Sequence, residues 1–199
     1  MMCLFYRTMI IALTAVLFSC AGGEVKHEAE NGVFNKKIEH VNVDADIEAD
    51  FTKAVALLNQ EQYQQAITVF ESVIAREQRL PAPYVNVAMA YSKLGDKEKA
   101  EENLISALKL DIGHPVANNE LGLLYRKAGK FNAARTAYQN AIKEHSEYLP
   151  AKRNLGVLCD LYLHDYKCAL EQFQDYLELV PGDKEVAIWV ADVERRQSR

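Results

Sequence analysis

Residues 115–148 read PVANNELGLLYRKAGKFNAARTAYQNAIKEHSEY, and the spacing of small and large apolar residues in this stretch recurs on both sides of it. One small residue returns about every 34 positions, at Ala54, Ala88, Gly122 and Gly156. A fixed period of about 34 residues is typical of two-helix units that bury their apolar faces by stacking on their neighbours. The sequence therefore predicts an all-α chain of repeated helical hairpins.

Further columns of small and large apolar residues keep the same interval. The set Ala66, Ala100 and Ala134 is followed four residues later by Phe70, Leu104 and Tyr138. The glycines at Gly95 and Gly129 stand where a helix would end in the left-handed conformation. We infer that glycines inside the first helix of a unit, such as Gly122, are required because the facing helix comes too close for a side chain.

These columns divide the repeat region, residues 47–196, into four units and a last helix. The fourth unit fits the columns only if one extra residue is allowed in the turn at 163–165, which places Phe173 in the column of Tyr138. The last helix carries an apolar face that includes Trp189, which we expect to close the end of the stack. The predicted boundaries are 47–80, 81–114, 115–148, 149–183 and, for the capping helix, 184–196.

Composition and charge exclude several classes of protein. The chain has 199 residues, of which 49% are hydrophobic and 26% charged, as in ordinary globular domains. It has 23 basic and 28 acidic residues, so it offers no broad cationic face, and we expect no nucleic-acid partner. Its cysteines and histidines are not spaced to hold a tetrahedral metal ion, so no metal site is expected.

The N-terminal stretch 1–19 carries one cation, Arg7, before an uncharged apolar run that ends at Phe18. This run is shorter than the roughly 20 apolar residues that span a bilayer, so it indicates an export signal. The segment Leu17-Phe18-Ser19-Cys20 resembles the lipobox of bacterial lipoproteins. That resemblance implies cleavage of the signal peptide, residues 1–19, and attachment of acyl chains such as palmitate to Cys20.

The resemblance to lipoproteins also implies a location. Ala21 after Cys20 favours the outer membrane by the sorting rule of enteric bacteria, so we expect a lipid anchor on its periplasmic face. An uncleaved anchor or ordinary cleavage nearby stays open as the alternative. Residues 20–46 are polar and lack an apolar period, which predicts a flexible tether.

The columns, turn glycines and helix-start prolines over residues 47–196 resemble the tetratricopeptide repeat superfamily, strongly in the second and third units. The resemblance implies a right-handed superhelix of about four repeats plus a capping helix. Together with the leader, it is distantly similar to the lipoproteins of type IV pilus assembly. Family members bind proteins or peptides in a concave groove lined by the first helix of each unit.

The groove positions of the family map onto a mixture of amide, cationic and apolar side chains in this sequence. The amides can hydrogen-bond the main chain of an extended peptide, and the cations favour an acidic segment or a terminal carboxylate. The alternative, that these are ordinary solvated residues, stays open. The predicted groove residues are Asn86, Met89, Lys93, Asn119, Leu123, Arg126, Lys127, Arg153, Asn154 and Val157.

The sequence holds no phosphate-binding loop, metalloprotease motif or nucleophile elbow, so we expect neither an enzyme, nor a cofactor, nor a small-molecule substrate. His114, His145 and His164 stand at unit or helix ends, where a protonated imidazole can stabilise a helix C-terminus. Two functions follow. The first is a membrane-tethered adaptor that binds a segment of an envelope complex. The second is an accessory subunit of a periplasmic enzyme or transport complex, bound through its convex face or open end.

Cys159 and Cys168 flank the turn of the fourth unit, one in the last turn of the first helix and one in the first turn of the second. Their side chains can face each other across the hairpin, and an exported protein folds in an oxidising compartment. The sequence leaves two interpretations open: a disulfide that staples this unit, or two buried thiols.

Overall fold

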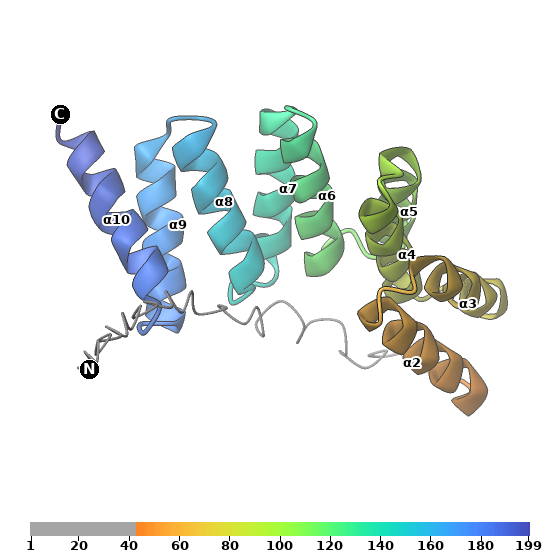
Figure 1. Cartoon of the computed structure of the whole chain (residues 1–199). Helices are drawn as coiled ribbons and strands as arrows, with labels where there is room; N and C mark the ends of the chain where they lie inside the picture. Colours follow the sequence, from red (N-terminus) through yellow and green to blue (C-terminus); the bar gives the residue numbers. More distant parts are fainter. Residues whose placement is uncertain (1–42) are drawn as a thin grey trace, which may run out of the picture.

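The computed structural model describes residues 43–199, and every regular element in that range is an α-helix. The predicted all-α class is confirmed. Helices α2 to α9 pair into four hairpins in chain order, and α10 follows them as a single helix. Figure 1 shows their arrangement, with α10 at the C-terminal end. The helices are α2 (Ala45–Asn59), α3 (Tyr63–Arg76), α4 (Pro81–Leu94), α5 (Lys97–Leu110), α6 (Pro115–Lys127), α7 (Phe131–Lys143), α8 (Leu149–Leu161), α9 (Tyr166–Leu179) and α10 (Lys184–Gln197).

Glycines end the first helix in the second and third hairpins. Gly95 follows α4 with φ 85°, and Gly129 follows α6 with φ 73°. The next amide then bonds back into the helix: the NH of Lys130 donates to the carbonyl of Tyr125 at 2.9 Å. An acidic cap starts α5, where the Asp96 carboxylate accepts from the amide of Lys99.

The helices of the third and fourth hairpins meet where an aromatic ring lies against a glycine. A Cβ atom built on Gly122 would lie 2.4 Å from Cε1 of Tyr138, and one built on Gly156 would lie 2.4 Å from Cε1 of Phe173. Both rings are fully buried, so they have no room to move aside. The sequence-based inference that the facing helix comes too close for a side chain at these glycines therefore agrees with the packing.

The fourth hairpin has the longer turn that its columns require. Residues 162–165 connect α8 to α9, whereas residues 128–130 connect α6 to α7. His164 takes up the additional bend with φ 53°, an uncommon conformation for a residue that is not glycine. The Asp165 carboxylate then accepts from the amide of Cys168 and starts α9.

Helix α10 closes the stack against α8 and α9. Val186 and Val193 on its inner side are fully buried, and the Trp189 ring packs on Phe173 with centroids 5.5 Å apart. Arg196 adds an ion pair to Asp160 of α8 at 2.7 Å. Trp189 therefore packs in the cap.

The predicted signal peptide, Cys20 and most of the tether lie outside the described residues. Among the helices of residues 43–199, none combines the length and the apolar character needed to cross a bilayer.

His114 departs from its predicted role. It is the N-cap of α6, where Nδ1 accepts from the amide of Ala117 at 3.2 Å. An accepting nitrogen must be unprotonated, so the neutral ring starts a helix, whereas we expected a cation at a helix end. Burial has the largest effect on the pKa of His114 and lowers it. Nearby Asp111 raises this pKa and His145 lowers it.

The glycine contact predicts the effect of Gly156→Ala. The new methyl group would strike the buried ring of Phe173, and we expect a loss of about 1–2 kcal/mol in unfolding free energy, although alanine favours a helix over glycine. Gly156→Ala should lower the unfolding free energy less in a Phe173→Leu background than in the wild-type protein, because the ring that the methyl group strikes is then absent. Urea unfolding measures both, with Gly182→Ala as a control because nothing lies within 4 Å of its Cβ position. A gain in stability from Gly156→Ala would contradict the contact.

The cap predicts a pH dependence. Because the folded pKa of His114 lies below its unfolded value of about 6.5, the folded state binds fewer protons between the two values. Stability is therefore complete above about pH 6.5 and falls as the pH drops through that value. His114→Asn keeps a capping acceptor without a titrating group. The difference between urea midpoints at neutral and mildly acidic pH should be smaller in this variant, and an equal difference would contradict the assignment.

Candidate binding face

The first helices of the second to fourth hairpins, α4, α6 and α8, carry the predicted groove residues. We call these ten residues the inner face. The structure links its members on α6 and α8 directly: the Nδ2 of Asn154 donates to the Oδ1 of Asn119 at 2.9 Å. Asn119 in turn donates to Oε1 of Glu120 at 3.3 Å and is only 3% exposed. Two of the amides expected to meet a ligand are therefore used to hold two helices together.

The three inner-face residues of α4 differ from one another in burial. Asn86 is buried and donates to the carbonyl of Ala82 in its own helix at 2.8 Å, while its Oδ1 has no hydrogen-bond partner among the described residues. Met89 is half-buried and Lys93 is exposed. Asn86 therefore retains one acceptor for which the described chain supplies no donor.

The arginines of the inner face divide into one engaged side chain and one available side chain. Arg153 pairs with Glu185 of α10 at 3.2 Å and lies over the Trp189 ring at 4.9 Å, so it fastens the cap. Arg126 lies 5.9 Å from the centroid of the Tyr162 ring. No carboxylate pairs with Arg126 in residues 43–199.

The apolar and remaining cationic members complete the face. Leu123 on α6 and Val157 on α8 are half-buried and pack against the core of the last two hairpins, while Lys127 is exposed at the end of α6. The face therefore offers apolar area beside polar groups, the mixture that is common in binding sites.

Sequence reasoning missed the hydroxyl group of Tyr138. It belongs to α7, is fully buried, and has no hydrogen-bond partner among the described residues. Burial raises the pKa of this phenol above its usual range, while nearby Arg126 lowers it and nearby Glu120 and Tyr162 raise it. The ring lies against Gly122, one turn before Arg126 on α6, so the hydroxyl belongs to the Arg126 end of the inner face. Buried polar groups without a partner are rare in folded proteins, so this hydroxyl needs a partner that the described chain does not supply.

A signal for this hydroxyl was present in the sequence. The equivalent column holds Phe70, Leu104 and Phe173, so Tyr138 alone adds a polar atom at a core position. Periodicity assigned the ring to the core and gave no indication of where its far end would lie.

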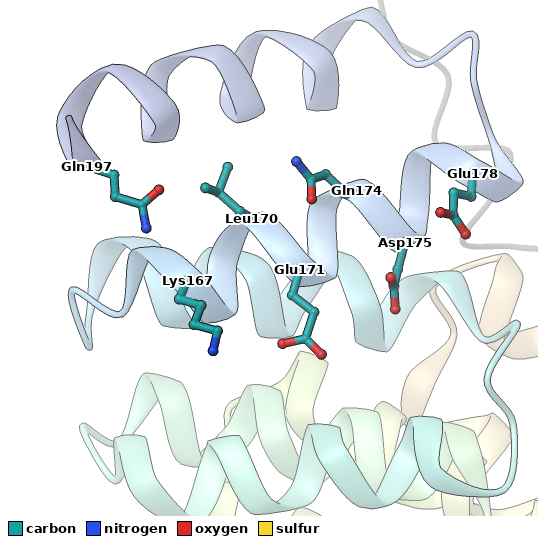
Figure 2. Close-up of a pocket in the computed structure, with 7 residues that line it drawn as sticks. All are labelled: Lys167, Leu170, Glu171, Gln174, Asp175, Glu178 and Gln197. Atoms are coloured by element: carbon teal, nitrogen blue, oxygen red, sulfur yellow. The ribbon is translucent and has the colours of Figure 1, made fainter.

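A shallow pocket of about 340 Å³ lies elsewhere, along α9 and beside the end of α10 (Figure 2). All of its lining residues except Leu170 are polar or charged, and one of its carboxylates, Asp175, pairs with the nearly buried Lys152 of α8 at 2.8 Å. The sequence columns did not indicate this pocket. Its lining residues are Lys167, Leu170, Glu171, Gln174, Asp175, Glu178 and Gln197.

Cys159 and Cys168 form a disulfide in the structure, with Cα atoms 5.9 Å apart. The sequence left a disulfide and two buried thiols as alternatives, and the structure contains the disulfide. Asp165 lies close enough for all three side chains to surround a metal ion. However, the bond uses both sulfurs, and Arg135 pairs with Asp165 at 2.7 Å. The arrangement is therefore a crosslink beside an ion pair.

Comparison with known proteins gives matches along most of the repeat region. Family models described as tetratricopeptide repeat match residues 48–77, 82–111 and 119–161. Among solved structures, Pseudomonas aeruginosa pilF has a TM-score of 0.69 at 18% identity, covering 76% of this chain and 69% of that chain. MamA of Desulfovibrio magneticus RS-1 has a TM-score of 0.65 at 17% identity, with coverages of 78% and 87%. A thermophilic TPR protein of Thermus thermophilus has a TM-score of 0.64 at 21% identity, with coverages of 84% and 90%. Identities this low show a shared fold alone.

The crosslink predicts a measurable contribution to stability. A disulfide that closes a loop of about ten residues stabilises by about 2–3 kcal/mol, mainly through the unfolded chain. Cys159→Ser with Cys168→Ser should lower the unfolding free energy by that amount, as should reduction of the wild-type protein. Mass measurement after alkylation without reductant is the direct check, and two alkylated thiols at these positions would contradict the bond.

Proposed function

Because this chain belongs to the tetratricopeptide repeat superfamily, we propose that it is a membrane-tethered adaptor in the cell envelope. Repeats of this family serve as protein-interaction scaffolds, and the chain shares that architecture. In the proposal, the inner face binds a segment of a partner protein and thereby supports assembly of an envelope complex. The complex is a pilus-like or secretin-like assembly, or an energy-coupling machine.

One observation supports binding at the inner face. Arg126 has no carboxylate partner in residues 43–199 and stands one turn after Gly122 on α6. The ring of Tyr138, whose hydroxyl has no partner among these residues, lies against Gly122. A carboxylate accepts hydrogen bonds from both kinds of donor, and a guanidinium can hold it with two bonds. We therefore assign an acidic side chain or a terminal carboxylate of the partner to this place. The half-buried Leu123 and Val157 supply apolar contact beside it.

The tether and the envelope location rest on the N-terminal sequence. Residues 1–19 read as an export signal and Cys20 stands at the expected lipidation position. Acyl chains on Cys20 would hold the repeats near a bilayer, in this proposal the periplasmic face of the outer membrane, because two or more chains anchor a protein stably.

A second candidate function uses a different surface. In it the chain is an accessory subunit of a periplasmic enzyme or transport complex and binds that complex through its convex face or open end, where the pocket along α9 and α10 lies outside the inner face (Figure 2). In that case the inner face takes no part in binding. The two candidates differ in which helices contact the partner.

Site-specific photocrosslinking separates the candidates. A photoreactive residue replaces Leu123 on the inner face, Gln174 at the pocket, or the exposed Gln139 of α7 as a control, in the tagged full chain within native envelopes. We expect a discrete crosslinked partner from position 123 alone. Crosslinks from position 174 with none from 123 would favour the accessory subunit.

Tyr138→Phe tests the role of the hydroxyl. Removing a buried group that has no partner should leave stability unchanged or raise it, while capture from position 123 weakens. Arg126→Ala should weaken capture further. The matched control is Tyr176→Phe, which loses the hydrogen bond to Asp183 (3.0 Å) and should lower stability without affecting capture. Undiminished capture by the Tyr138→Phe and Arg126→Ala double variant would contradict the assigned carboxylate site.

A further inference from the structure

The turns within the second, third and fourth hairpins lie along one edge of the molecule, the upper edge in Figure 1. We call residues 93–99, 126–131 and 161–167 the turn edge. The end of α10 reaches the same edge, because Gln197 lines a pocket together with Lys167 and Arg196 pairs with Asp160. The repeat itself causes this alignment, since every unit turns at the same position.

The turn edge differs in charge from the rest of the chain. Its three segments hold seven lysines and arginines and three acidic residues, whereas the whole chain has 23 basic and 28 acidic residues. Two of the three acids are already engaged, Asp96 with Lys99 at 3.4 Å and Asp165 with Arg135 of α7 at 2.7 Å. Exposed Lys97 and Lys127 have no carboxylate partner in the described part of the chain.

Large apolar side chains are exposed among these cations. Leu94 is 49% exposed, Leu161 58% and Tyr162 43%. Leu94 follows Lys93 directly, and the Tyr162 ring lies on Phe131 and under Arg126. Aliphatic and aromatic side chains flanked by lysines are the combination that enters the headgroup region of a bilayer while its charges meet anionic lipids.

We propose that the turn edge docks on the surface of an anionic lipid bilayer. The inference rests on the proposed tether, because a chain held at Cys20 cannot move far from the membrane. A segment as long as residues 20–42 spans roughly 80 Å when fully extended and about 25–30 Å on average as a flexible coil. The turn edge of the repeats is thus within reach of the bilayer that holds the anchor.

Docking by this edge has a consequence for the inner face. Helices α4 to α9 run between the turn edge and the opposite edge (Figure 1), so a docked domain stands upright on the bilayer. Most of the inner face then points sideways, parallel to the membrane, and stays open to a partner. An acidic protein is the other occupant that a basic edge could take, but the exposed leucines beside the lysines favour lipid.

The experiment uses the full chain on vesicles of phosphatidylcholine alone or with phosphatidylglycerol. Amide hydrogen exchange should slow severalfold in residues 93–99, 126–131 and 161–167 on the anionic vesicles only, and high salt should reverse the effect. Exchange at the opposite edge, including residues 144–148, should be the same on both vesicles. Equal exchange of the turn edge on the two lipids would overturn the proposal.

Charge reversal provides the matched variants. Lys97→Glu, Lys130→Glu and Lys167→Glu together should abolish the protection, because each lysine near an anionic surface contributes about fivefold in binding. The control reverses the exposed Lys109, Lys143 and Lys184 at the opposite edge and should keep it. These residues lie outside the inner face, so the variants do not test partner capture. Loss of protection in the control set, or its persistence in the first set, would contradict docking by this edge.

Two further readouts separate the claims. Flotation with neutral vesicles reports on the anchor, and Cys20→Ser should abolish acyl attachment. If the chain fails to float with neutral vesicles, the tether is wrong, and the comparison of the two lipids still decides whether the edge binds anionic membrane. Protection of the turn edge by an acidic protein, with none from anionic vesicles, would overturn the lipid assignment.

Discussion

The structure depends on how closely two helices approach within a hairpin. In the third and fourth hairpins a buried aromatic ring lies where a Cβ atom would be, opposite Gly122 and Gly156. This contact fixes the distance between the helices. Because the Tyr138 ring extends across α6, the same contact brings its hydroxyl near Arg126. A packing requirement of the core therefore places a buried polar group beneath the binding face.

The inner face is held in place by contacts between successive units. The amides of Asn119 and Asn154 join α6 to α8, and Arg153 joins α8 to α10 through Glu185 and Trp189. These side chains lose freedom when the protein folds, so a partner that meets the face does not have to immobilise them. Residues that the sequence marked for direct ligand contact instead keep the site rigid around Arg126.

The sequence predicted the fold well because a repeated column records which side of each helix is buried, and it predicted the extra residue in the fourth turn. The sequence could not predict which surface side chains form hydrogen bonds with one another. Asn119 belongs to the face as predicted, yet its bond to Asn154 depends on the separation of two helices. His114 showed the same limit. Its position at a unit boundary was clear, but which helix it contacts was decided by the direction of the chain after α5.

Charge separation connects the surfaces of this molecule. The chain is acidic overall, but its cations gather at the turn edge and at the adjoining end of the inner face, while Glu171, Asp175 and Glu178 follow one another along α9. Arg126 and Lys127 belong to both cationic surfaces. An acidic partner segment bound near Arg126 would thus lie close to any membrane that the turn edge touches, and the cations would reduce the repulsion between that segment and anionic lipids. A scaffold with this distribution can hold an acidic segment beside a bilayer of the same charge.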